Sequence, residues 1–174
     1  MKLHHLVIQN ILIILFGVTV LYLDYIEFAG FDSRILLVAF SIIKSGYFVV
    51  TGFRKILAFS KSDLKYHHFL LFIGLSITLM VISFAADYIC LYVIDPESFS
   101  GVTAGMSWLE TSIRFWFFSV FIFANIGVVT IAPTSLAAEF LMMTEAVLSF
   151  ITIILVLSDF ISLKESLIGP KAKA

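Results

Sequence analysis

The sequence predicts an all-α membrane protein with four transmembrane helices and one further apolar segment that does not cross. Of its 174 residues, 61% are hydrophobic and only 13% are charged, whereas about a quarter are charged in soluble domains. The mean hydropathy is +1.09. Four apolar runs of spanning length, with most basic residues on one side of them, complete the prediction. A formal net charge of −1 gives no support to nucleic-acid binding.

Each predicted span has about the 20 apolar residues that a helix needs to cross some 30 Å of hydrocarbon. The four segments are Leu6–Leu23, Ile35–Phe53, Phe69–Ile94 and Ser135–Phe160. A fifth apolar segment, Trp108–Pro133, is long enough to cross. It carries Glu110 and Arg114 near its start, however, and leaves almost no connector before the last span.

The charges predict the orientation of the chain. Eight of the eleven basic residues flank the outer ends of the first and last spans or lie between the second and third: Lys2, Arg54, Lys55, Lys61, Lys65, Lys164, Lys171 and Lys173. The positive-inside rule places these regions, and both termini, in the cytoplasm. An even number of crossings is then required, so Trp108–Pro133 must enter and leave on the outer face. Such a segment is tolerated only where protein buries it or where it lines an aqueous cavity.

Lys44 lies about ten residues from either end of the second span, too deep for its ammonium group to reach water. An unpaired charge at this depth is costly, so a partner is expected. Asp87 in the third span and Glu145 in the fourth are the candidates. A static ion pair is the simpler interpretation and a gating charge is the alternative.

The fifth segment resembles the pore loop of potassium channels. The run Phe117-Phe118-Ser119 leads, at the spacing of that family, to a filter-like stretch, Asn125-Ile126-Gly127-Val128-Val129-Thr130, followed by Pro133. The next helix, with Glu145-Ala146, resembles the pore-lining helix of small prokaryotic channels. The resemblance covers about Phe69–Phe160. It implies a homotetramer around a central axis in a prokaryotic plasma membrane.

The filter-like stretch departs from the potassium-channel pattern at most positions. Gly127 keeps the first glycine, but Val129 replaces the second, and its β-branch disfavours the positive φ that a glycine permits. Asn125 replaces the filter threonine, Val128 the tyrosine and Thr130 the aspartate. We therefore expect no potassium-selective filter. A ring of Asn125 amides below apolar side chains would form a wide, weakly selective pore, a hydrophobic constriction or a plug.

Two residues of the last span are candidates for gating or support of this loop. Glu145 either hydrogen-bonds behind the pore helix or faces the cavity, and Ser149 replaces the hinge glycine that the resemblance implies. Arg114 is expected to pair with Glu110, one helical turn before it.

The predicted organisation has three parts. Residues 1–66 form two peripheral helices and a basic linker, residues 67–163 the channel-like pore domain, and residues 164–174 a short cytoplasmic tail. Passive conduction of monovalent cations is the first functional hypothesis, and a non-conducting structural or regulatory protein on a channel scaffold is the second. We expect no enzyme activity, cofactor or metal site. The expected partners are the lipid bilayer and further copies of the chain.

Overall fold

The computed structural model describes residues 32–60, 66–103, 105–127 and 130–168. The predicted first span, Leu6–Leu23, lies outside the described residues, as do the filter positions Val128 and Val129. The described part is mostly helical, which confirms the predicted all-α class.

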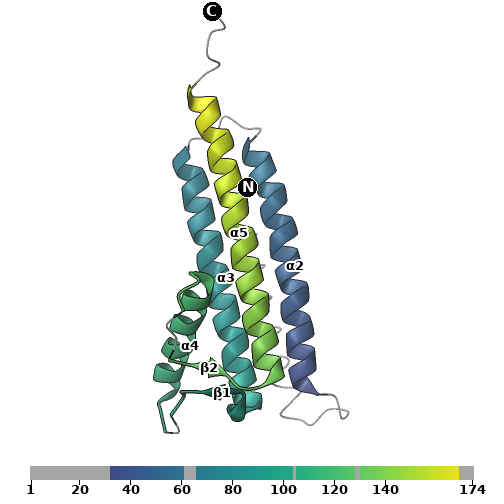
Figure 1. Ribbon diagram of the computed structural model, residues 1–174, viewed down its shortest axis with the longest axis vertical. Helices are drawn as coiled ribbons and strands as arrows, with labels where there is room; N and C mark the ends of the chain where they lie inside the picture. The colour runs from purple at the N-terminus through teal and green to yellow at the C-terminus, as the bar shows by residue number, and fades with distance from the viewer. Residues whose placement is uncertain (1–31, 61–65, 104, 128–129, 169–174) are drawn as a thin grey trace, which may run out of the picture.

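Three long helices form the body of the molecule. They are α2 (Ser33–Ser60), α3 (Tyr66–Ile94) and α5 (Leu136–Ile168). Each contains a stretch long and apolar enough to cross a membrane, namely Ser33–Arg54, Leu70–Ile94 and Leu136–Ser158. These stretches lie within a residue or two of the second, third and fourth predicted spans. Figure 1 shows the three helices side by side, with α2 and α5 running in one direction and α3 in the other.

The helices α2 and α5 continue past the ends of the predicted spans, which were Phe53 and Phe160. Apolarity marks only the part of a helix that suits hydrocarbon, whereas the helix itself ends where the backbone is interrupted. Residues 54–60 and 161–168 contain neither glycine nor proline. Gly169-Pro170 follows directly after α5, and this pair is a typical signal for the end of a helix.

A shorter helix, α4 (Trp108–Phe123), packs beside α3. Before it come the 3₁₀-helix η2 (Pro96–Ser98) and the strand β1 (Phe99–Ser100); after it comes β2 (Ala132–Pro133). The two strands pair antiparallel, with Phe99 opposite Pro133. Figure 1 shows both strands at the end of the bundle where α3 ends and α5 begins. The chain therefore leaves this end to form α4 and returns to the same end before α5.

Aromatic rings hold α4 against α3 and β1. The rings of Tyr88 and Phe118 meet edge to face with centroids 4.9 Å apart, and those of Phe99 and Phe115 do so at 5.1 Å. All four side chains are buried. Aromatic pairs in this geometry contribute about 0.5–1.5 kcal/mol each beyond the burial of their surface.

Candidate functional site

A buried ion pair joins α2 to α3. Lys44 Nζ contacts Asp87 Oδ2, and the two side chains are 1% and 5% exposed. Ser41 Oγ donates a hydrogen bond to the same carboxylate oxygen at 2.9 Å, and Lys44 Nζ donates to the Ser83 carbonyl at 3.4 Å. Of the two partners expected for Lys44, the structure therefore selects Asp87 and not Glu145.

Glu145 lies at a second buried polar junction, where α3, α4 and α5 meet. The Tyr88 hydroxyl donates to Glu145 Oε2 at 2.6 Å, and Ser119 Oγ lies 2.5 Å from Glu145 Oε1. Ser119 Oγ is also 2.9 Å from the Val81 carbonyl oxygen. Glu145 is fully buried, and its carboxyl group points from α5 toward α4.

A second contact between α4 and α5 lies one helical turn further along both helices. Ser149 Oγ donates to the Phe123 carbonyl at the end of α4. This carbonyl is among the last four of its helix, and for these the helix itself provides no N–H donor. Ser119 and Phe123 are four residues apart, as are Glu145 and Ser149, so each pair lies on one face of its helix. Together the two contacts fasten the second half of α4 to α5.

Asn125 ends α4 and turns the chain back. Its φ of 54° lies in the left-handed region, which asparagine tolerates better than most residues. The Asn125 N–H donates to the Ile122 carbonyl, and the Ile126 N–H donates to the Phe121 carbonyl. This pattern is the Schellman motif of helix C-termini. The side-chain amide Nδ2 of Asn125 also lies 3.5 Å from Ser149 Oγ, which is a long contact.

The structure describes three further filter positions, Ile126, Gly127 and Thr130. Ile126 is 46% exposed, and Thr130 is exposed as well. Gly127 does not adopt a positive φ, and a side chain there would meet open space. The described part of this stretch is therefore an irregular return segment between α4 and β2.

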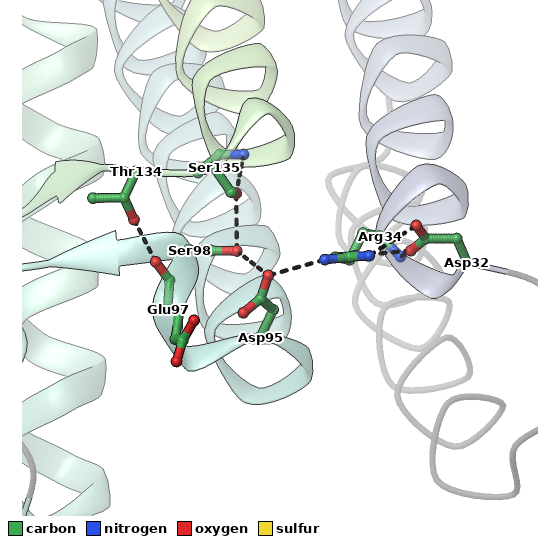
Figure 2. Close-up of polar contacts among 8 residues, drawn as sticks. Asp32, Arg34, Asp95, Glu97, Ser98, Thr134 and Ser135 are labelled. Atoms are coloured by element: carbon green, nitrogen blue, oxygen red, sulfur yellow. Dashed lines mark hydrogen bonds and ion pairs between the residues drawn. The ribbon is translucent and has the colours of Figure 1, made fainter.

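Figure 2 shows a network of polar contacts that connects the start of α2 to the end of α3 and the start of α5. Arg34 Nη1 donates to Asp95 Oδ2 at 3.2 Å. Ser98 donates to the same oxygen at 2.9 Å, and Ser135 donates to Ser98 at 2.9 Å. Ser135 Oγ in turn accepts from the Ala138 N–H in the first turn of α5. Each hydroxyl proton in this network serves one acceptor.

Arg34 also pairs with Asp32, at 3.0 Å between Nε and Oδ1. The hydrogen bond from Arg34 lowers the pKa of the Asp32 carboxyl below its ordinary value of 3.8. A lowered pKa stabilises the folded state above about pH 3.8, and the stabilisation is lost as the pH falls through the pKa of the folded protein. Because both side chains are exposed, the effect is small.

We expect Arg34→Gln to lower the unfolding midpoint by less than about 4 °C near pH 7. The difference from the wild-type protein should become smaller as the pH falls toward 2, because the stabilisation that Arg34 gives to ionised Asp32 is lost as that carboxyl takes up its proton. Thermal unfolding of the purified protein in detergent measures both shifts. An equal loss at the two pH values would mean that the packing of Arg34, and not its pairing with carboxylates, is what matters.

Arg114 and Glu110 pair on the surface of α4, at 3.5 Å between Nη2 and Oε1. Their side chains are 37% and 51% exposed. An exposed pair of this kind contributes only a few tenths of a kcal/mol, so it supports the helix without fixing its position.

The sequence pattern does not identify the partners of Glu145. Ser119 belongs to the Phe-Phe-Ser run and Tyr88 follows Asp87 directly, but the pattern gives neither residue a role. A carboxyl group in an apolar helix requires hydrogen-bond donors, so a hydroxyl on each neighbouring helix was the available signal. Which hydroxyl meets it depends on how the helices are rotated about their axes, and hydropathy does not specify that rotation.

Within the described residues the fold is that of an all-α protein with three helices long and apolar enough to span a membrane. No family model, curated protein or solved structure matches the chain. The potassium-channel resemblance therefore rests on the motifs and their spacing alone.

Proposed function

We propose that the chain is one subunit of a channel-like membrane protein that conducts ions passively, with weak selectivity for cations and none for potassium. In this proposal Leu6–Leu23 forms a fourth span and both termini lie in the cytoplasm of a prokaryotic cell. The α4 helix and the return segment then form a pore loop that enters and leaves the outer face of the membrane.

The path of the chain around α4 carries the proposal. A helix of 16 residues is about 24 Å long, too short to cross some 30 Å of hydrocarbon. The chain enters α4 from one end of the three described helices that are long enough to cross, and after α4 it returns to that same end. The irregular backbone after Phe123 requires burial in protein or an aqueous cavity if it lies at membrane depth. A pore formed by several copies would provide that cavity.

The contacts between α4 and α5 support the proposal because they fix the position of the C-terminal end of α4. The Glu145–Ser119 and Ser149–Phe123 contacts hold this end against α5, away from both ends of that helix. The C-terminus of a helix carries a partial negative charge, which favours nearby cations. Asn125 presents its amide group at the same place.

The exposed side of α5 offers a surface for assembly. Seven of the eight exposed large apolar residues that the structure describes on this helix, all but Ile153, recur at alternating intervals of four and three: Leu136, Phe140, Met143, Val147, Phe150, Ile154 and Leu157. Such a repeat is the pattern of helices that pack against one another in register. In the proposed homotetramer these stripes meet near the central axis, where bulky apolar side chains would form a constriction that closes by dewetting.

Current through the reconstituted protein tests the proposed function. We expect single-channel currents in planar bilayers with a potassium-to-sodium permeability ratio near one. Asn125→Asp places a negative charge at the turn while keeping a residue that tolerates the left-handed conformation. It should raise the cation-to-anion permeability ratio severalfold, because a fixed charge in a narrow passage concentrates counter-ions.

Ser112→Asp is the matched control, because it adds the same charge near the start of α4 and away from the turn. An equal effect of both variants would contradict the role of Asn125. Strong potassium selectivity would contradict our interpretation of the filter. Absence of current under varied voltage, pH and lipid would favour the non-conducting scaffold. A stable monomer or dimer in detergent would contradict the proposed tetrameric pore.

A further inference from the structure

The hydroxyl group of Ser119 lies between two groups that accept hydrogen bonds. Ser119 Oγ is 2.9 Å from the Val81 carbonyl oxygen and 2.5 Å from Glu145 Oε1. A carbonyl group only accepts, and an ionised carboxylate also only accepts. Ser119 has one proton, so it can donate to one of them. If Glu145 were ionised, the other contact would bring two oxygen atoms together with no proton between them.

We infer that Glu145 is a neutral carboxylic acid, which joins α4 to α3 and α5 through its own proton. Glu145 then donates to Ser119 Oγ, and Ser119 donates to the Val81 carbonyl. The Tyr88 hydroxyl donates to the other oxygen of Glu145, 2.6 Å away. Every proton of the junction is used once, as it is among the hydroxyl groups of Figure 2.

The charges around the junction favour the same state. Glu145 is fully buried, and none of the described basic side chains forms an ion pair with it. Lys44 from α2 is bound to Asp87 on α3, so the charges of this pair largely cancel at Glu145. From α3 and α4 the groups in contact are the hydroxyls of Tyr88 and Ser119. An ionised carboxylate without a cation is costly in such surroundings.

A proton-dependent attachment of α4 follows from this arrangement. When Glu145 loses its proton at alkaline pH, Ser119 can no longer satisfy both acceptors, and an unpaired charge appears where three helices meet. The contact between α4 and α5 should then weaken. This inference concerns the attachment of α4 and holds whether or not the protein conducts ions; only an effect of pH on current rests on the proposed function.

Infrared spectroscopy of the purified protein tests the protonation state directly. Near neutral pH we expect the carbonyl stretching band of a protonated carboxylic acid, absent from Glu145→Gln and unchanged in Glu139→Gln, an exposed acid on the same helix. Ser119→Ala should shift that band, since it removes a hydrogen-bond partner of the acid. Absence of the band in the wild-type protein, or its persistence in Glu145→Gln, would overturn the inference.

Thermal unfolding gives a second test that does not depend on spectral assignment. A glutamine side chain reproduces the neutral acid, because its amide group donates to Ser119 and its oxygen accepts from Tyr88. Glu145→Gln should therefore unfold within about 4 °C of the wild-type protein near neutral pH. At alkaline pH, its unfolding midpoint should also fall less than that of the wild-type protein. A large loss at neutral pH, or an identical alkaline decline, would contradict the inference.

Discussion

Asp87→Asn is expected to destabilise the protein by about 3–5 kcal/mol, because it leaves the ammonium group of Lys44 buried without its counter-charge. Lys44 is 1% exposed, so in the folded protein its charge has no water to replace the lost carboxylate. Lys44→Met leaves the carboxylate of Asp87 with the Ser41 hydrogen bond but without a counter-charge, and should cost a similar amount. The free energy of unfolding in detergent, measured with a chemical denaturant, checks both values.

The double variant Lys44→Met/Asp87→Leu separates a structural ion pair from a requirement for charge. Replacing a whole buried pair by apolar residues is often neutral, since neither charge then remains without a partner. We expect the double variant to recover most of the stability lost in either single variant. Glu139→Gln, which removes an exposed acid from α5, is the control and should change stability by less than about 0.5 kcal/mol. Additive losses would mean that the two side chains do not depend on each other.

Gly101→Ala is expected to disrupt the close approach of the backbone just after β1 to the backbone just before β2. Gly101 has a φ of +84°, and a Cβ atom there would lie 2.0 Å from the Thr130 carbonyl oxygen. This oxygen belongs to the backbone, so it cannot move aside as a flexible side chain could. Left-handed backbone alone costs an alanine about 1–2 kcal/mol, and the close contact adds to that cost. We expect a total loss above about 2 kcal/mol in the free energy of unfolding.

Gly105→Ala is the matched control for this prediction. Gly105 also has a positive φ, +96°, but a Cβ atom there meets nothing within 4 Å. It therefore reports the cost of the backbone conformation alone, and the difference between the variants measures the close approach of Gly101 to Thr130. Equal losses would mean that the return segment before β2 moves away from Gly101 freely.

The long helices could be predicted from the sequence because their signal is local. Three runs of apolar residues of spanning length gave Ile35–Phe53, Phe69–Ile94 and Ser135–Phe160, and the structure has a suitable helix at each. The need for a partner for Lys44 was also evident, since a charge in an apolar helix is costly wherever it points. These conclusions require composition and length but no knowledge of how the helices are arranged.

The pairing of side chains between helices could not be predicted in the same way. The choice between Asp87 and Glu145 as the partner of Lys44 depends on the rotation of each helix about its axis. The mean hydropathy of a helix that is apolar all round says little about that rotation. Asn125 shows a related limit, because its place in a filter-like motif suggested a role in binding ions. In the structure it first serves as the left-handed residue that ends α4.

The ion pair between α2 and α3 also bears on how such a chain is inserted into a membrane during synthesis. Inserted alone, α2 would carry one unpaired charge in its apolar part and α3 another, at a cost of about 2.5–3.5 kcal/mol each on insertion scales. Only five residues separate Ser60 from Tyr66, so the two helices leave the ribosome in close succession. Insertion of both as a helical hairpin brings Lys44 and Asp87 together before either must enter lipid. From the same contact that stabilises the folded protein, we therefore expect α2 to insert more efficiently when α3 follows it.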